Sequence, residues 1–367
     1  MYTLRPPTGI DSLLGNEGLL MSLAKRKIGI LTNQNVLTQD YKISAYALKE
    51  KLGNAIKCIL SPEHGWSGFI AEGVKIDHGF DPILELPIFS LYGGNKKSLE
   101  FIKENIDVLL IDLQDVGLRC YTYAATCAKV FEKCVGSDIE IIICDRPNPL
   151  GSKVRDPGLE PDYRSLVSYL DVPFQHGQTM GQLLSVHNKA HGNLPLTVIP
   201  CEPYCQPWES AWVPPSPNLP SWEAVLLYPA LVFLEGTNVS EGRGTSLPFT
   251  CLGAPGLDSK KFVSFLNQED HQGIRARPLV FTPQSSKFKG KECQGVHLLI
   301  TDASKLEAFS LGINILHFLK EKYADFKWEK MTNKKEAYFI DYLYGTDSVR
   351  KALDKGVPAS QVLERFK

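Results

Sequence analysis

Five short apolar runs in the first 144 residues constrain the fold more than any other feature of the sequence. They are Lys27–Thr32, Ile56–Leu60, Pro87–Leu91, Val108–Leu113 and Glu140–Cys144. Helical spacing of apolar residues occurs between them, at Tyr41–Leu52 and Thr122–Val135. Near-continuous apolar strands are typical of a parallel sheet that is covered on both faces. The alternation therefore predicts an α/β fold, a Rossmann-like parallel sheet with helices on both faces.

With 367 residues the chain exceeds the roughly 250–300 residues at which a single core stops growing, so we expect two domains. We place a Rossmann-like N-terminal domain at residues 1–195 and a smaller C-terminal α+β domain at 196–367, with an active-site cleft between them. Beyond residue 151 we expect helices at Thr179–Ala190, Asp258–Asn267 and Leu306–Tyr323, and strands at Leu196–Ile199, Arg275–Phe281 and Gly295–Thr301. We interpret Gln206–Pro220 as an ordered loop, because linkers seldom carry tryptophan.

Composition argues against several classes of function. The 40 basic and 41 acidic residues leave a net charge of -1, and no Lys/Arg-rich block is present, so we expect no nucleic-acid partner. No apolar run approaches the ~20 residues that cross a bilayer, so we expect no membrane insertion. The nine cysteines form no C-x-x-C pair, and the N-terminal residues do not resemble a secretory signal. We therefore expect a cytoplasmic protein with reduced thiols.

Polar residues follow each of the five expected strands. Glu63 and His64 come after the second strand, Asp115 and Arg119 after the fourth, and the segment Asp145–Pro149 after the fifth. Ligands of open α/β sheets bind at this carboxyl edge. No G-x-G-x-x-G or P-loop motif follows any strand, so we expect no nucleotide cofactor. Four dense segments of polar residues and glycines point to a sugar ligand instead: Ser61–Gly65, Asp112–Tyr123, Pro215–Pro220 and Glu235–Thr245.

These segments, in this order, resemble the exo-acting β-N-acetylmuramidases, bacterial peptidoglycan hexosaminidases formerly grouped as a domain of unknown function. The matching motifs are PEHG at Pro62–Gly65, QDVG-x-R-x-YTY at Gln114–Tyr123 and EGTNVSEGRGT at Glu235–Thr245. The resemblance implies release of N-acetylmuramic acid from non-reducing ends, with no metal or nucleotide cofactor. Gln182 and Thr250 depart from the family pattern, in which acidic residues are common at these two positions.

Hydrolysis of a glycosidic bond requires a proton for the leaving oxygen and a group that handles the oxocarbenium-like charge. We predict Glu63 as the general acid, which is also the role that the resemblance implies for the glutamate of PEHG. The alternative is a structural glutamate that pairs with a neighbouring helix N-terminus. The second group stays open among Asp115, Glu235, Glu241, a tyrosine at 121 or 123, and the substrate's own acetamido group. Tyr121 and Tyr123 would act in the manner of the sialidase tyrosine.

The lactyl carboxylate of N-acetylmuramic acid calls for a cation, and arginine binds carboxylates through two hydrogen bonds. Arg119, Arg146 and Arg243 are the candidates. The other predicted substrate-binding residues share polar side chains within the motif loops: His64, Asn148, His176, Asn218, Glu235 and Asn238. Neither histidine of this set is accompanied by an H-x-x-x-H or clustered carboxylate pattern, so we expect no metal.

The expected partner is a small carbohydrate, either a muropeptide or a disaccharide, and the expected role is cell-wall recycling. Two rival functions stay open. One is a sugar-binding protein without catalysis, and the other is a peptidoglycan amidase or esterase. The second rival needs an activated nucleophile, yet the chain has no G-x-S-x-G elbow.

Overall fold

A computed structural model describes residues 6–92, 96–201, 212–268, 271–331 and 337–366. The chain folds into two compact units, and neither is one continuous segment. Unit 1 comprises Met1–Ser152 and Gly177–Pro217, and unit 2 comprises Lys153–His176 and Asn218–Lys367. In the part of the chain that the model describes, no helix is long and apolar enough to span a membrane.

Unit 1 is built on a seven-stranded sheet with the order β3-β4-β2-β1-β5-β6-β7. Its strands are β1 Ile28–Leu31, β2 Ile56–Ser61, β3 Gly79–Asp81, β4 Leu86–Ser90, β5 Val108–Ile111, β6 Glu140–Cys144 and β7 Leu196–Ile199. All neighbours pair in parallel except β3 and β4, which are antiparallel. The order reverses between β1 and β5, and such a switch point is where open α/β sheets bind ligands.

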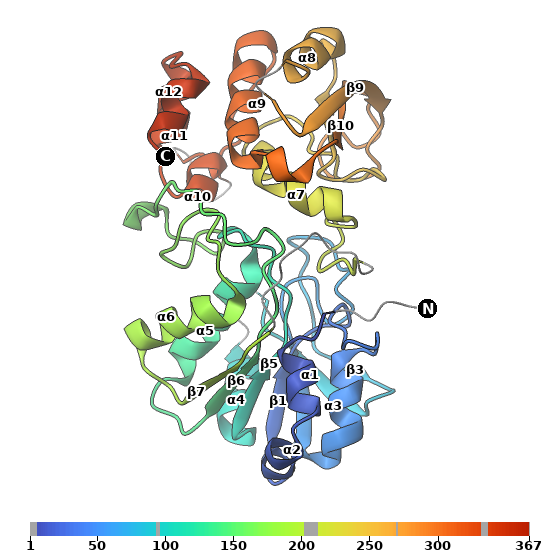
Figure 1. The fold of residues 1–367 in the computed structure, drawn as a ribbon, viewed down its shortest axis with the longest axis vertical. Coiled ribbons are helices and arrows are strands. Elements are labelled where there is room, and N and C mark those ends of the chain that lie inside the picture. Colours follow the sequence, from blue (N-terminus) through green and yellow to red (C-terminus); the bar gives the residue numbers. More distant parts are fainter. Residues whose placement is uncertain (1–5, 93–95, 202–211, 269–270, 332–336, 367) are drawn as a thin grey trace. The chain divides into compact units, whose positions relative to one another are not determined.

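Helices cover both faces of this sheet, as Figure 1 shows. They are α1 Gly9–Leu14, α2 Glu17–Leu23, α3 Ser44–Leu52, α4 Lys96–Asn105, α5 Thr122–Cys134 and α6 Met180–His191, with the 3-10 turn η1 Gly53–Ala55. Apolar residues of α1, α2 and α3 share one core with alternate residues of the strands, such as Ile28 and Ile30. Gly9 permits the tight start of α1, since a Cβ there would lie 2.4 Å from the Ile199 carbonyl oxygen.

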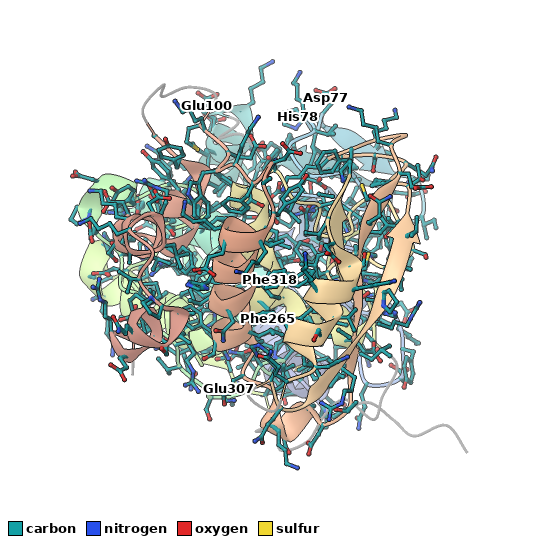
Figure 2. All side chains as sticks on the ribbon, turned by 90° about the horizontal axis from the view of Figure 1, so that it is seen from above. Asp77, His78, Glu100, Phe265, Glu307 and Phe318 are labelled. Atoms are coloured by element: carbon teal, nitrogen blue, oxygen red, sulfur yellow. The ribbon has the colours of Figure 1, made fainter. Side chains whose placement is uncertain are left out.

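Unit 2 contains an antiparallel sheet of β8 Cys251–Ala254, β9 Ile274–Phe281 and β10 Cys293–Ile300, in the order β8-β10-β9. Its helices are α7 Trp222–Leu231, α8 Ser259–Leu266, α9 Ala308–Lys322, α10 Phe339–Tyr344, α11 Ser348–Asp354 and α12 Ala359–Glu364, and its 3-10 turns are η2 Pro161–Tyr163, η3 Val232–Gly236 and η4 Ala303–Lys305. Phe265 of α8 and Phe318 of α9 stack at 4.7 Å between ring centroids (Figure 2). This contact joins the two helices through buried aromatic area.

The predicted architecture is confirmed: a mostly parallel sheet with helices is followed by a smaller unit with an antiparallel sheet. All five strands of the first half form, and each end differs from the prediction by two residues or fewer. The strand expected at Leu196–Ile199 also forms, but it pairs with β6 in the large sheet. The structure therefore divides the chain differently from the boundary that we expected after residue 195. Part of the Gln206–Pro220 loop, residues 206–211, lies outside the described residues.

Candidate active site

Glu63 lies in a sharply folded loop at the carboxyl end of β2. His64 and Gly65 follow it with φ values of 68° and 72°, in the left-handed region that costs a non-glycine residue about 1–3 kcal/mol. The His64 Nδ1 atom is 2.7 Å from the Ile70 carbonyl oxygen. Because a carbonyl only accepts, Nδ1 carries the proton and Nε2 remains an acceptor in the neutral ring. The loop therefore fixes the backbone beside Glu63.

Two hydroxyl groups position the Glu63 carboxylate. Thr122 Oγ1 donates to Glu63 Oε2 at 2.6 Å. Tyr92 also forms a hydrogen bond with Glu63, and burial together with the Glu63 charge raises the pKa of Tyr92 to about 12. Thr122 is the first residue of α5, so Glu63 does contact a helix N-terminus, as the structural alternative predicts. The same contacts hold the carboxyl group in place and also suit a positioned general acid.

Tyr121 and Tyr123 lie on either side of Thr122, with ring centroids 4.7 Å apart. The Tyr123 hydroxyl donates to the Pro215 carbonyl at 2.7 Å and accepts from Asn33 Nδ2 at 3.2 Å. Burial raises the pKa of Tyr123 far above its ordinary value, and the Glu63 charge adds to this rise. A nucleophilic tyrosine must lose its proton, and these surroundings oppose that loss at Tyr123.

Arg146, one of the three predicted lactyl-binding arginines, forms a buried ion pair with Asp112. Arg146 Nε and Nη2 lie 2.6 and 3.0 Å from the two Asp112 carboxylate oxygens. The same Nη2 donates to the Leu37 carbonyl at 3.0 Å. Side-chain exposure is 3% for Arg146 and 0% for Asp112. This guanidinium therefore joins the loops after β5 and β6, and the geometry assigns it a structural partner.

Asp115 and Asn148 brace the same two loops. Asp115 Oδ2 accepts from the Gly117 backbone at 2.7 Å. Asn148 accepts from the Leu150 backbone at 2.9 Å and donates to the Gln178 carbonyl at 3.0 Å. Gly117 has a φ of 85°, and a Cβ there would lie 2.4 Å from Asn148 Oδ1. Only glycine fits this position, which explains the glycine of the QDVG motif.

In unit 2, the EGTNVSEGRGT segment holds a group of charged residues around the buried Glu241. Arg243 lies 2.5 Å from Glu235 and 3.1 Å from Glu241. Lys287 Nζ lies 3.0 Å from Glu241 and donates to the Leu234 and Val239 carbonyls at 2.6 and 3.1 Å. Burial raises the pKa of Glu235 despite the opposing charge of Arg243. Each carboxylate of this segment therefore has a cationic partner within the unit.

The remaining predicted binding residues differ in burial. The Asn238 side chain donates to the Asp325 carbonyl at 2.7 Å and accepts from the Lys327 backbone at 2.8 Å, which fixes the chain locally. His176 and Arg119 are buried, and Asn218 is half-buried. The substrate-binding roles of all these residues stay predictions.

Within unit 1, contacts between side chains connect the loops at the carboxyl edge of the sheet. Glu63 links the loop after β2 to Tyr92, which follows β4, and Asn33 links the loop after β1 to Tyr123. Sequence reasoning did not single out Asn33, Tyr92, Thr122 or Lys287 as site residues. Thr122 stands within the YTY motif and Asn33 directly follows a strand, so the sequence alone could have indicated both as site residues. Nothing in the local sequence around Lys287 indicated its contact with Glu241.

Comparison with known proteins identifies the family. The N-terminal and C-terminal domain models of the exo-β-N-acetylmuramidase NamZ match residues 28–223 and 226–367. The peptidoglycan β-N-acetylmuramidase NamZ of Bacillus subtilis is 34% identical over 98% of this chain and 87% of that protein. Two crystal structures of DUF1343 family proteins from Bacteroides fragilis are similar. One has a TM-score of 0.84 at 25% identity, covering 99% of this chain and 95% of the other. The second has a TM-score of 0.75 at 30% identity, covering 98% and 94%. The chain therefore belongs to the NamZ family of exo-β-N-acetylmuramidases.

Proposed function

We propose that this protein hydrolyses the β-glycosidic bond of N-acetylmuramic acid at the non-reducing ends of peptidoglycan fragments, with Glu63 as the general acid. The Bacillus subtilis relative is named for peptidoglycan β-N-acetylmuramidase activity. The observation that carries the catalytic assignment is the Thr122 hydroxyl, which lies 2.6 Å from Glu63 Oε2 at the carboxyl edge of the sheet. This contact holds one carboxyl oxygen, so the other can carry the proton to the leaving group.

The most direct test replaces Glu63 with glutamine, which keeps the shape and can still accept from Thr122 but has no acidic proton. We expect kcat on a chromogenic β-N-acetylmuramide to fall by at least about 100-fold, since general acid catalysis contributes ~10²–10⁴. The melting temperature of Glu63→Gln should stay near the wild-type value. The control is Glu50→Gln, at a glutamate of α3 whose side chain is 64% exposed and pairs with Lys42 at 3.4 Å.

The outcomes separate the alternatives. Activity of Glu63→Gln within about threefold of wild type removes Glu63 from the acid role, for which a larger loss is expected. Loss of activity together with a large fall in melting temperature supports the structural role at the start of α5. No turnover by the wild-type protein, combined with measurable binding of the sugar, supports the function of a sugar-binding protein.

Several candidates for the second group already have close protein partners. Asp115 accepts from Gly117, and Glu241 lies near both Arg243 and Lys287. Tyr123 donates to the Pro215 carbonyl. We therefore favour attack on the anomeric carbon by the carbonyl of the substrate's own 2-acetamido group, because this route needs no protein nucleophile. A muramide with an N-trifluoroacetyl group, whose carbonyl is less nucleophilic, should be hydrolysed much more slowly. Equal rates for the two substrates would exclude this route.

We also propose that the protein acts in a reducing compartment on fragments of the cell wall that are being recycled. Among the described residues, six cysteines are both free and buried: Cys58, Cys127, Cys134, Cys144, Cys251 and Cys293. Free buried thiols are typical of proteins that work in the cytosol. Fractionation of cells followed by immunodetection tests the location, and detection only outside the cytoplasm would contradict it.

A further inference from the structure

Two histidines and a glutamate form a compact group on the helices of unit 1, away from the residues described above. His187 and His191 are one turn apart on α6, and Glu132 lies in the last turn of α5. One potential ligand atom from each residue lies within 4.8 Å of the other two. Sequence reasoning found no cluster of histidines or cysteines with the spacing of metal ligands and overlooked the H-x-x-x-H spacing of this pair.

The ring nitrogens of both histidines suit a metal ion. His191 Nδ1 is 3.1 Å from the His187 carbonyl oxygen, so Nδ1 carries the proton and Nε2 keeps its lone pair for a ligand. His187 Nε2 is 3.3 Å from Glu132 Oε1. Tetrahedral zinc with bonds of about 2.0–2.1 Å separates neighbouring ligand atoms by about 3.3 Å. The Glu132–His187 pair therefore already has the spacing that a zinc ion requires.

The surrounding structure holds the ends of these two helices together. A Cβ at Gly192, the C-cap of α6, would lie 2.3 Å from Val135 Cγ2, so the helix ends pack closely. The Asn188 side chain donates to the Leu194 carbonyl and accepts from the Leu194 backbone, both at 2.9 Å. The rings of His187 and His191 stack with centroids 4.1 Å apart, so the exposed His191 ring has to rotate before both nitrogens face one ion. The three side chains therefore start from a rigid backbone.

We propose that Glu132, His187 and His191 bind a divalent cation of the zinc type, which links α5 to α6. Two imidazoles and a carboxylate form a donor set that suits Zn²⁺, and water would take the fourth position. Thr122 and Glu132 are ten residues apart on α5, about 15 Å along the helix axis. The ion is therefore remote from Glu63 and stabilises the fold of unit 1 without taking part in hydrolysis. Lys129 is the neighbouring cation that interacts with Glu132, and the bound ion competes with it.

Zinc titration of the full-length protein tests this proposal. Protein dialysed against EDTA is titrated with Zn²⁺ in competition with a chromophoric chelator, and with Co²⁺ to detect the absorption of a tetrahedral site. We expect one equivalent of metal to bind to the wild-type protein. His191→Ala changes an exposed side chain, so it should fold normally. It should bind at least about tenfold more weakly, since even the loss of an outer partner of a metal ligand costs 10–100-fold.

A matched control is His317→Ala in α9, where His317 lies 3.5 Å from Glu321 at the same i,i+4 spacing. The group of potential ligands found in the described residues does not include this pair, so its loss should leave zinc binding unchanged. Zinc at about 100 times its Kd should raise the melting temperature of wild type and His317→Ala by about 5 °C or more, and that of His191→Ala by less. Equal zinc affinity of His191→Ala and wild type, or no saturation at one equivalent, would overturn the proposal. Hydrolysis by the EDTA-treated protein is measured separately, because it tests the proposed catalytic function and not the zinc site.

Discussion

The buried pair of Asp112 and Arg146 gives the sharpest test of what holds the loops after β5 and β6 together. Arg146→Met removes two hydrogen bonds to Asp112 and one to the Leu37 carbonyl, and it leaves Asp112 as a charge with no exposed side-chain surface. Removal of one partner of a buried ion pair costs about 3–5 kcal/mol. A domain of 150–250 residues loses about 2–4 °C per kcal/mol, so the melting temperature of unit 1 should fall by about 6–20 °C.

Differential scanning calorimetry measures this loss, and two further variants serve as controls. Arg26→Met removes an arginine that pairs with Glu140 at 3.3 Å but has 35% side-chain exposure. Such a pair contributes about 0–1 kcal/mol, so this variant should melt within a few degrees of wild type. The double variant Asp112→Leu with Arg146→Met replaces the whole pair by apolar groups and should recover most of the stability.

The reasoning is refuted if Arg146→Met melts like the wild-type protein and instead raises KM for β-N-acetylmuramides. That result would mean that the guanidinium is held for the lactyl carboxylate of the substrate. It would also support the substrate-binding role that the sequence predicted for Arg146.

Two further predictions concern the charged residues of each unit. Lys287→Met leaves Glu241 without the cation at 3.0 Å, so we expect the free energy of unfolding, measured by urea denaturation, to fall by about 3 kcal/mol. The control is Lys261→Met, which removes an exposed ion pair with Asp258 (side-chain exposures of 75% and 48%) and should change this free energy by less than about 0.5 kcal/mol. The wild-type enzyme should prefer a β-N-acetylmuramide over the matching β-N-acetylglucosaminide by about 100-fold or more in kcat/KM, since charge-assisted hydrogen bonds between an arginine and the lactyl carboxylate contribute about 1.5–3 kcal/mol each. Arg119→Met should reduce this preference, and an unchanged ratio would remove Arg119 from lactyl recognition.

The parallel strands were predictable because burial on both faces requires an uninterrupted apolar run. The strand β3 has only three residues, two of which are exposed, so it leaves no such pattern. The helix α7 is apolar on nearly all sides and contains Pro229, and therefore shows no helical periodicity. The strand β7 was found, but a local pattern does not specify which sheet a strand joins. Its pairing with β6 depends on the β6–α6–β7 crossover, which is a tertiary feature.

The position of Glu63 was predictable for a different reason. A parallel sheet places the residues after every strand at one edge, so a loop rich in polar residues is a candidate site wherever it follows such a strand. The partners of those residues were not predictable, because they come from distant segments. Asp112 and Arg146 are 34 residues apart, and Thr122 and Glu63 are 59 residues apart. Sequence alone therefore proposed three equivalent arginines and could not identify Asp112 as the partner of Arg146.

The same distinction explains why the histidine pair of α6 was overlooked. Two histidines four residues apart on a helix are visible in the sequence, but a pair of this kind is common without a metal. The feature that distinguishes this pair is Glu132, which lies 55 positions before His187 in the sequence but 3.3 Å from it in the structure. A third ligand atom from a second helix makes the geometry that of a chelating site. The helix α5 thus contributes to two groups of residues, because its start supplies Thr122 to Glu63 and its end supplies Glu132 to the histidines.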